Sequence, residues 1–290
     1  MKKYSGEIWI ILGAILWGTT GTSQAFAPRN ASSLSIGAVR LALGGIALFI
    51  FSRWRGHSFN DNSWPRAATV FSGLSVAVYN LFFFAGVAKT GVAVGTIVTI
   101  GSSPILAGFL GWLIRKEQPG WKWGLATVVA VIGGTILVLP GEQLSIDIAG
   151  IVFALLAGLA YATFAVASKN LLEDIQPEVV MAVVFCLGAL LLSPLLFFQD
   201  LSWLIEINGW LSALHLGLFA TAAAYLFYGH GLKFVPVAKA TTLTLAEPLT
   251  ASLLGILVLG ERFSTSAGLG IGLILIGLTI LTLRTRKNVS

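Results

Sequence analysis

The chain has 290 residues, of which 56% are hydrophobic and only 10% are charged, and its mean hydropathy is +0.89. This leaves too little polar surface to cover a soluble globule, so the composition predicts an integral membrane protein. The formal net charge of +6 is explained by basic loops beside a membrane, and no nucleic-acid partner is expected. A single cysteine, Cys186, excludes an intramolecular disulfide and a multi-cysteine metal site.

Apolar stretches of about 20 residues, the length that crosses a bilayer, recur along the whole chain. The first one follows basic residues and ends on Ala25-Phe26-Ala27, as a signal peptide does. Its apolar run from Ile8 to Phe26 is long for a signal peptide and right for a span, so we interpret it as a span. The ten predicted spans are about 8–27, 34–52, 67–87, 91–114, 121–139, 148–168, 178–198, 210–231, 235–259 and 266–283. Short connections leave room for one all-α membrane domain and no soluble one.

The basic residues predict the orientation, because Lys and Arg gather in cytoplasmic loops. With a cytoplasmic amino terminus, the outer side receives only Arg29, Lys89 and Arg262. The cytoplasmic side then receives Lys2, Lys3, Arg53, Arg55, Arg66, Arg115, Lys116, Lys122, Lys169, Lys233, Lys239, Arg284, Arg286 and Lys287. Both termini are therefore predicted in the cytoplasm. Arg40 is left over inside the second span, where it either snorkels outward or pairs with a carboxylate.

The two halves of the chain resemble each other at a constant offset of 144 residues. Matches without gaps are Leu12 with Leu156, Thr19 with Thr163, Phe83 with Phe227, Lys89 with Lys233, Pro104 with Pro248, Ala107 with Ala251, Gly111 with Gly255, Glu117 with Glu261, Gly124 with Gly268 and Gly133 with Gly277. The predicted repeats are residues 1–144 and 145–290, with five spans each. Because five is odd, the second repeat enters the membrane from the opposite side, as in inverted-repeat transporters.

One carboxylate, Glu247, falls near the middle of a span and precedes Pro248. A charge at that depth costs about 2.5 to 3.5 kcal/mol, so it is a functional-site hypothesis by default. Pro248 and its repeat mate Pro104 are predicted to kink their helices and to act as hinges. Ser103 is the mate of Glu247, so the predicted site is asymmetric in charge. A protonated or hydrogen-bonded Glu247 that only stabilises the kink is the alternative reading.

Further polar and aromatic residues lie at similar depth in other spans. The candidate substrate-binding residues are Trp17, Thr20, Tyr79, Asn80, Ser102, Tyr161, Tyr225, Tyr228 and Glu247. Aromatic rings with a few hydroxyl and amide groups suit a ligand with apolar and polar parts, although each residue by itself also fits helix packing. Seven tryptophans at span ends are interpreted as interfacial anchors: Trp54, Trp64, Trp112, Trp121, Trp123, Trp203 and Trp210.

Several chemistries are not expected. The chain has no G-x-x-x-x-G-K-[ST] phosphate loop, so transport would run on a gradient, and no cofactor or metal is predicted. Glu247 could carry a proton or bind the amino group of a substrate. A membrane-embedded enzyme is a remote alternative, because H-E-x-x-H is absent and Gly101-Ser102-Ser103 has no evident histidine partner. The last span carries Gly268-Leu-Gly-Ile-Gly272 and is expected to pack within its repeat or against a second subunit.

These features together resemble the drug/metabolite transporter superfamily, in particular bacterial members built of two EamA-type repeats. The resemblance covers the full chain and rests on the ten spans, the duplication, Trp17-Gly18, and the paired endings Pro104 to Glu117 and Glu247-Pro248 to Gly260-Glu261-Arg262. Ser103 departs from the pattern, since it replaces the acid of the Glu-Pro pair in the first repeat.

The resemblance implies a ten-helix inverted-repeat fold with a central cavity lined by spans 1, 3, 4, 6, 8 and 9, and a supporting role for spans 5 and 10. It also implies export of small metabolites such as amino acids across the bacterial inner membrane. Export of cationic drugs or amines, with Glu247 as counter-ion, is the alternative. The expected partners are a small-molecule substrate, the lipid bilayer and, if spans 5 and 10 pack between subunits, a second copy of the chain.

Overall fold

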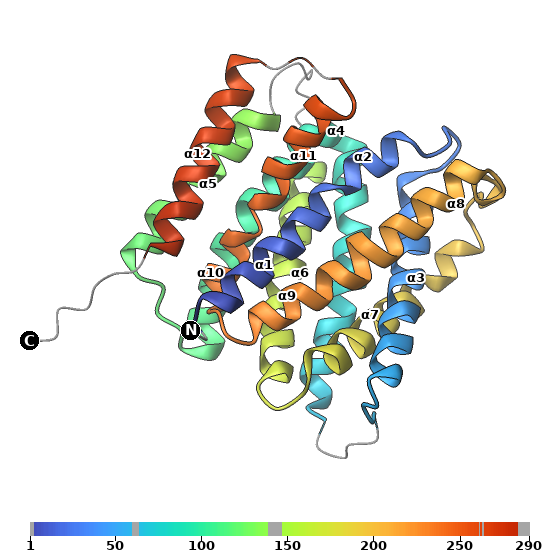
Figure 1. Cartoon of the computed structure of the whole chain (residues 1–290), viewed down its shortest axis with the longest axis horizontal. Helices are drawn as coiled ribbons and strands as arrows, with labels where there is room; N and C mark the ends of the chain where they lie inside the picture. Colours follow the sequence, from blue (N-terminus) through green and yellow to red (C-terminus); the bar gives the residue numbers. More distant parts are fainter. Residues whose placement is uncertain (1–2, 60–63, 139–146, 261, 263, 284–290) are drawn as a thin grey trace, which may run out of the picture.

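The computed structural model describes residues 3–59, 64–138, 147–260, 262 and 264–283, with side chains from Gly6 onward. Sequence features at Lys2, Pro140-Gly141, Glu261, Arg284, Arg286 and Lys287 lie outside these residues. The described elements are α1 (Lys3–Gly18), α2 (Thr20–Ala25), α3 (Ser33–Trp54), α4 (Arg66–Arg115), α5 (Trp121–Val138), α6 (Ile148–Leu172), α7 (Pro177–Leu196), the 3-10 helix η1 (Ser202–Ile205), α8 (Ile207–Leu214), the π-helix η2 (His215–Ala223), α9 (Ala224–Leu232), α10 (Val237–Leu243), α11 (Ala246–Leu257) and α12 (Thr265–Thr282). Throughout these ranges the regular structure is helical (Figure 1).

Within the described residues, eight helical segments are long and apolar enough to cross a membrane. The chain is therefore an all-helical, multi-pass membrane protein. Two features explain why eight such segments are found where the sequence predicts ten spans. The first predicted span forms α1, which has 16 residues, and the short α2. The third and fourth predicted spans are joined in α4, which is 50 residues long.

A turn divides α4 at Gly91, whose φ is 79° and ψ is 164°. Only glycine adopts this backbone conformation without strain. A Cβ placed on Gly95 would lie 2.9 Å from Val87 Cγ2. Eight residues of straight helix span about 12 Å, so this contact requires the chain to double back. Figure 1 shows the two parts of α4 running in different directions from its label.

The α5 and α12 helices pack directly against each other and lie together at one side of the bundle (Figure 1). Glycines let their backbones approach: a Cβ on Gly133 would lie 2.8 Å from the Gly270 carbonyl, and one on Gly277 would lie 2.8 Å from the Ala126 carbonyl. The last span was expected to pack within its own repeat or against a second subunit, and it packs instead against α5 of the other predicted repeat. The contact uses Gly270, however, whereas nothing lies within 4 Å of a Cβ on Gly272, because that residue faces away from α5.

Small residues also bring α3 against α7 and α4 against α6. Cys186 on α7 donates from Sγ to the Gly45 carbonyl on α3 at 3.2 Å, in keeping with a packing role. On α6, a Cβ at Gly158 would lie 2.3 Å from Ser102 Oγ on α4. Close approach of backbones through small residues is the usual way in which membrane helices associate.

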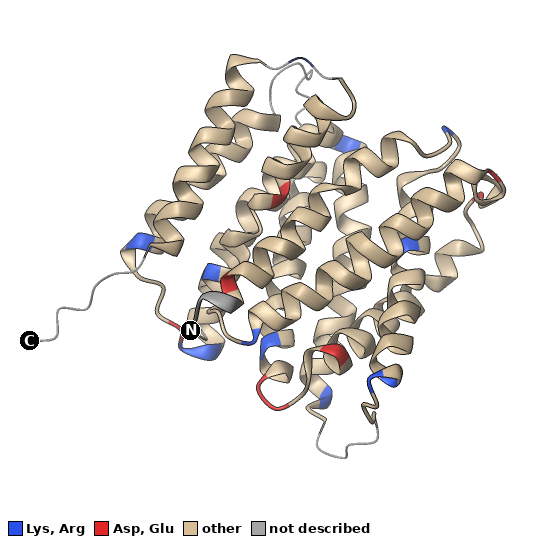
Figure 2. Ribbon diagram, viewed as in Figure 1, with Lys and Arg blue, Asp and Glu red and all other residues tan. Residues whose placement is uncertain are grey.

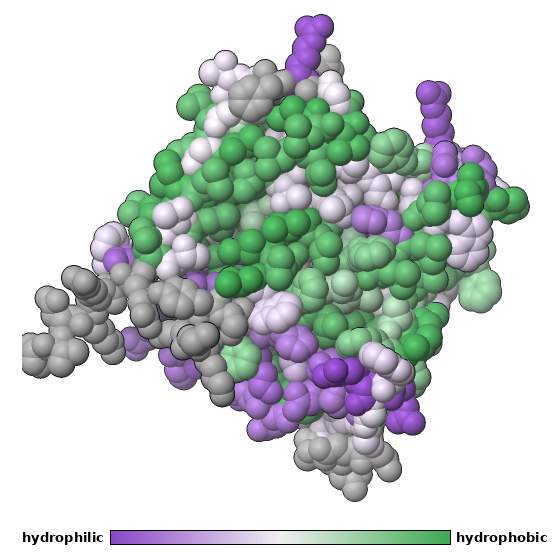
Figure 3. Space-filling model, viewed as in Figure 1, coloured by the Kyte–Doolittle hydropathy of each residue, from purple (hydrophilic) through white to green (hydrophobic). Residues whose placement is uncertain are grey.

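Charged and apolar surfaces are separated along the bundle. Figure 2 shows most Lys, Arg, Asp and Glu residues near the end of the bundle where the chain begins, with few in its middle. Figure 3 shows a broad hydrophobic surface above that end. Large apolar side chains of the membrane-length helices, such as Ile50, Leu190 and Ile276, are more than half exposed. An apolar exposed band of this kind is what lipid contact requires.

One predicted interfacial tryptophan has a different position. Trp203 on η1 is fully buried and packs in a cluster with Ile36, Val39 and Leu216. The loop before α8 folds over α3, so a residue at the end of a span became a core residue. By contrast, Trp54 and Trp121 are 78% and 74% exposed, as interfacial anchors are.

Candidate substrate-binding site

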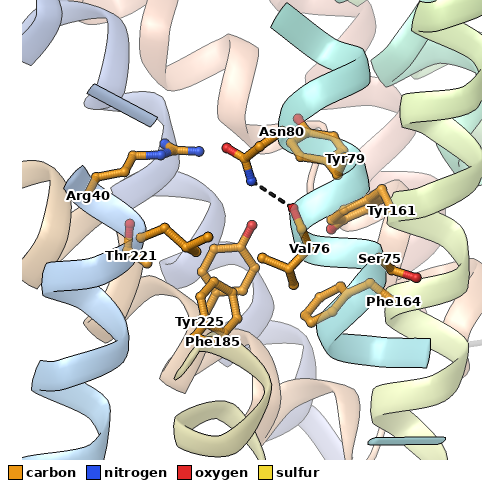
Figure 4. Close-up of a pocket in the computed structure, with 11 residues that line it drawn as sticks. Arg40, Ser75, Val76, Tyr79, Asn80, Tyr161, Phe164, Phe185, Thr221 and Tyr225 are labelled. Atoms are coloured by element: carbon orange, nitrogen blue, oxygen red, sulfur yellow. Dashed lines mark hydrogen bonds between the residues drawn. The ribbon is translucent and has the colours of Figure 1, made fainter. Parts of the chain in front are cut away.

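A narrow central pocket lies between α3, α4, α6, α7, η2 and α9. Five predicted spans thus contribute to it, two of which, the second and the seventh, were not expected to. Figure 4 shows the residues that line it: Arg40, Leu41, Ser75, Val76, Tyr79, Asn80, Tyr161, Phe164, Phe185, Thr221 and Tyr225. Four of the predicted substrate-binding residues are among them: Tyr79, Asn80, Tyr161 and Tyr225.

The polar groups of the pocket come from both of its sides. In Figure 4 the guanidinium of Arg40 on α3 points across the pocket toward Asn80 on α4. Asn80 Nδ2 donates to the Val76 carbonyl at 2.8 Å, which fixes its amide. Thr221 donates to the Leu216 carbonyl five residues earlier at 2.8 Å, the spacing of a π-helix. These bonds hold the side chains in place, as a binding site requires.

Aromatic rings form the rest of the wall. The Tyr225 ring lies 4.1 Å from Phe185 and 4.7 Å from Trp17, measured between centroids. Tyr228 is fully buried behind them, with its ring 6.4 Å from Tyr161. The hydroxyls of Tyr161 and Tyr228 interact with each other, whereas the Trp17 indole Nε1 is buried without a hydrogen bond to any described residue. A buried donor of this kind favours a site that a polar ligand or water completes.

Glu247 lies in the first turn of α11, just after a break in its span. The α10 helix ends at Leu243 and α11 begins at Ala246, with Glu247 N–H donating to the Thr244 carbonyl at 2.9 Å. A carboxylate is stabilised at the amino-terminal end of a helix. Glu247 is half-buried and does not line the pocket itself, but its carboxylate interacts electrostatically with Arg40 and with the hydroxyls of Tyr79 and Tyr225. The pocket region therefore contains one basic and one acidic group.

The two prolines of the repeat have different surroundings. Pro248 lies in the first turn of α11, beside the interruption between α10 and α11. Pro104 lies inside α4, where the backbone stays helical and the one non-helical residue is Gly91. The hinge roles of both prolines stay predictions.

Two other predicted residues lie away from the pocket. Ser102 faces α6, where its hydroxyl donates to the Thr99 carbonyl at 3.2 Å and contacts Gly158. Thr20 is half-buried on α2 and lines no pocket described above. Ser102 and Thr20 were both chosen by their depth in the membrane. Depth gives no information about which side of a helix faces the site.

Sequence reasoning missed Arg40 as a pocket residue, together with Ser75, Phe164, Phe185 and Thr221. Arg40 had a usable signal, because a basic residue inside an apolar span is itself a functional-site hypothesis. Phe164 and Phe185 had none, since apolar residues surround them on every side of their helices. Among the described residues, no group of three or more His, Cys, Asp or Glu could hold a metal ion.

Both halves of the chain match the model of the EamA-like transporter family, over residues 4–139 and 148–283. A Bacillus subtilis (strain 168) protein named uncharacterized transporter YwfM is 41% identical over 288 residues, covering 99% of this chain and 97% of the relative. The uncharacterized inner membrane transporter YicL of Salmonella typhimurium is 24% identical, with 98% and 97% covered. The threonine/homoserine exporter RhtA of Escherichia coli (strain K12) is 27% identical over 87% of this chain and 82% of its own length.

A solved crystal structure resembles the chain with a TM-score of 0.83, over 96% of this chain and 97% of the other. The two sequences are 19% identical, so this likeness concerns the fold.

Proposed function

Because the chain belongs to the EamA-like transporter family, whose members are transporters and not enzymes, we propose that it is a secondary transporter that exports small metabolites, above all amino acids. Transport is driven by a gradient or is facilitative. The membrane is the bacterial inner membrane, as in the name of the Salmonella relative. The name of the Escherichia coli relative, a threonine/homoserine exporter, supports amino acids as cargo.

The observation that carries this proposal is the combination of Arg40 and Glu247 beside one aromatic pocket. An amino acid presents a carboxylate and an ammonium group on the same carbon atom. Arg40 binds the carboxylate through its guanidinium, and Glu247 binds the ammonium group. The side chain of the cargo lies among Tyr161, Phe164 and Phe185, so aromatic or hydrophobic amino acids are slightly preferred.

The remaining site residues have supporting roles in this proposal. Asn80 and the hydroxyls of Tyr79 and Tyr225 orient the cargo, while Trp17 and Tyr228 hold the tyrosines in position from behind. Thr20 and Ser102 stay predicted substrate-binding residues that nothing in the pocket supports. Pro104 and Pro248 are proposed to allow the helix movements of the transport cycle.

The proposal includes ten membrane crossings in two inverted repeats, residues 1–144 and 145–290. In support, the family model matches each half separately. The turn at Gly91 divides α4 into two parts of about 25 residues, each long enough to span, and α1 continues into α2. Both termini are then cytoplasmic. In right-side-out cells an external protease should leave a carboxyl-terminal tag intact; cleavage of that tag would contradict the topology.

A homodimer through α5 and α12 also stays a proposal. The glycines of these helices are used within the chain, so a second copy would contact their outer faces, where Val128 and Leu275 are exposed. Cross-linking between Val128→Cys chains in native membranes tests it, and an exclusively monomeric product would rule it out.

Counterflow in proteoliposomes tests the function. Vesicles loaded with one unlabelled amino acid should accumulate the same labelled amino acid from outside, without added energy. A panel of amino acids is compared with amines that lack the carboxylate. Accumulation of amines alone would favour the cationic-drug alternative, in which Glu247 is the counter-ion and Arg40 has no partner on the cargo. Accumulation of neither class would overturn the proposed function.

A further inference from the structure

A second and larger cleft, of about 880 Å³, opens at the other end of the bundle from the charged surface. Its lining residues come from the α1–α2 junction, α2, α8, the start of η2 and α11: Thr19, Thr22, Ser23, Phe26, Asn208, Leu211, Ser212, His215 and Leu254. Most of these are polar, which is unusual in a helix bundle whose exposed surface is otherwise apolar. In the proposed topology this is the outer side.

Three polar side chains in this cleft lack partners. Within the described part of the chain, the side chains of Thr22, Ser23 and Asn208 make no hydrogen bond. Other threonines on the same bundle donate to a carbonyl four residues earlier, as Thr90 and Thr163 do. Thr22 and Ser23 are half-buried and Asn208 is exposed, so water or a ligand in the cleft can reach all three. The cleft therefore offers a few polar groups on a mostly apolar wall, which suits a ligand with both polar and apolar parts.

The hydrogen bonds of His215 define which of its nitrogens is available. Thr19 Oγ1 lies 2.6 Å from the Leu16 carbonyl and 2.8 Å from His215 Nε2. The carbonyl can only accept, so the single hydroxyl proton points to it, and Nε2 must carry the proton of the second bond. In the neutral ring, Nδ1 is then an acceptor, and no described residue donates to it.

The position of His215 connects this cleft with the central pocket. His215 is the first residue of η2, and Thr221 in the same π-helix lines the pocket. The His215 ring is held against Phe219, with centroids 5.5 Å apart. Thr221 is fixed in turn, because it packs against Gly44 of α3. The π-helix η2 thus contributes residues to both the outer cleft and the central pocket. Turns of π-helix are frequent at functional sites.

We propose that the outer cleft is a second binding site for the amino-acid cargo, in which His215 Nδ1 accepts a hydrogen bond from its ammonium group. The hydroxyls of Thr22 and Ser23 and the amide of Asn208 bind the carboxylate. Phe26, Leu211 and Leu254 contact the side chain. Thr19 is a positioning residue that fixes the ring through Nε2. This site rests on the proposed function, since it takes the same cargo.

Protection from a thiol reagent tests the site without relying on transport. Cys186 is first replaced by Ser, and Leu254→Cys is added as a reporter in the cleft. A membrane-impermeant thiol reagent is applied from outside, with and without L-threonine. Binding in the cleft should slow labelling in a saturable way. The matched control is Ile205→Cys in η1, between α7 and α8 on the outer side in the proposed topology, which is 85% exposed and should gain no protection.

Two variants separate this site from the central pocket. His215→Leu should raise the L-threonine concentration needed for protection about tenfold, which is the loss of one hydrogen bond to a charged group. Ser23→Ala, which keeps the carbonyl that Ser212 uses, should raise it by a smaller factor. Glu247→Gln should leave protection unchanged. Gel filtration checks that each variant is folded.

The outcomes distinguish the two proposals. Protection that survives Glu247→Gln and weakens in His215→Leu supports the outer site. Protection that disappears in Glu247→Gln and is unchanged in His215→Leu would overturn it, because cargo in the central pocket would then explain the effect. Counterflow without any protection would overturn the outer site and leave the proposed function standing. Absence of both would overturn both.

Discussion

Glu117 Oε2 accepts a hydrogen bond of 2.7 Å from the backbone N–H of Val237, which joins the end of α4 to the start of α10. The other oxygen of this carboxylate lies 3.2 Å from Arg115 Nε. Arg115 also binds Asn170 and Glu173 at the end of α6. One carboxylate therefore links the ends of three helices on the charged side of the bundle.

Two lysines extend this connection to further helices. Lys169 Nζ of α6 donates to the carbonyls of Leu232, at 2.9 Å, and Val235 at the end of α9. Lys239 of α10 pairs with Glu7 of α1. Helices α1, α4, α6, α9 and α10 are thus tied together at the ends that are cytoplasmic in the proposed topology, while the large cleft lies at the other end. If that topology holds, this arrangement is an outward-facing state.

Removal of the Glu117 carboxylate should loosen the cytoplasmic end. We expect Glu117→Ala to lower the free energy of unfolding by about 1 to 3 kcal/mol, because it leaves Val237 N–H without its partner and removes one of the three partners of Arg115. A cysteine at buried Ala240 should also be labelled faster from the cytoplasmic side. The control is Glu206→Ala, an exposed carboxylate that makes no ion pair with any described residue. Equal behaviour of the two variants would show that Glu117 does not hold these helices together.

Glu247→Gln should change transport or its pH dependence while leaving membrane insertion intact. The neutral amide imitates the protonated carboxyl, so wild-type transport should approach that of the variant as the pH falls and the carboxyl gains its proton. At higher pH the transport rates of the wild type and the variant should differ. Only the wild type then has a carboxylate that can bind the cargo or accept a proton. Uptake rates in proteoliposomes measure this across pH. Identical rates at every pH would remove Glu247 from the mechanism.

Gly91→Ala should destabilise the protein through the backbone. A φ of 79° with a ψ of 164° is a conformation that alanine avoids, at a cost of about 1 to 3 kcal/mol. No atom lies within 4 Å of the added Cβ, so a clash would not contribute. Gly124→Ala is the matched control, because Gly124 also has open space but lies in a helix, where alanine is favoured. In thermal unfolding in detergent, Gly91→Ala should lower the unfolding temperature and Gly124→Ala should not.

Gly133→Ala should weaken the contact between α5 and α12. The new methyl group would lie 2.8 Å from both the Gly270 carbonyl and the Ile274 backbone nitrogen, and neither backbone can yield without moving the helix. We expect a loss of about 1 to 3 kcal/mol, as for other overpacked contacts. Its neighbour Gly134 has nothing within 4 Å, so Gly134→Ala should be neutral in the same unfolding assay. Equal effects at both positions would contradict the packing described here.

The sequence predicted the spans closely because hydropathy reports how much of the chain lies in lipid. The predicted span at 266–283 corresponds to α12 at Thr265–Thr282, and the one at 34–52 to α3 at Ser33–Trp54. The predicted break between the spans at 67–87 and 91–114 corresponds to the turn at Gly91, the one residue of α4 with a non-helical backbone. The inverted orientation and the repeat boundaries stay predictions.

The site was predicted less completely than the fold. Depth along a span can be counted, and four of the residues chosen by depth, Tyr79, Asn80, Tyr161 and Tyr225, line one pocket. The direction of a side chain around the helix cannot be read when all faces are apolar, so Ser102 was included and Phe164 was not. For Arg40 the sequence left two possibilities, snorkelling outward or pairing with a carboxylate; the side chain lines the pocket and makes no ion pair with any described residue. Its place in the pocket depends on how α3 packs against α7 and η2.

The most direct test of the central claim is counterflow of labelled L-threonine compared with a diamine such as putrescine, in wild-type protein and in Arg40→Gln. If the pocket holds amino acids through Arg40 and Glu247, the wild type accumulates L-threonine, and Arg40→Gln raises its KM about tenfold or more, which corresponds to a lost charge-assisted hydrogen bond. Arg53→Gln, at the exposed end of α3, should have no effect. Accumulation of putrescine but no amino acid, unaffected by Arg40→Gln, would contradict the account.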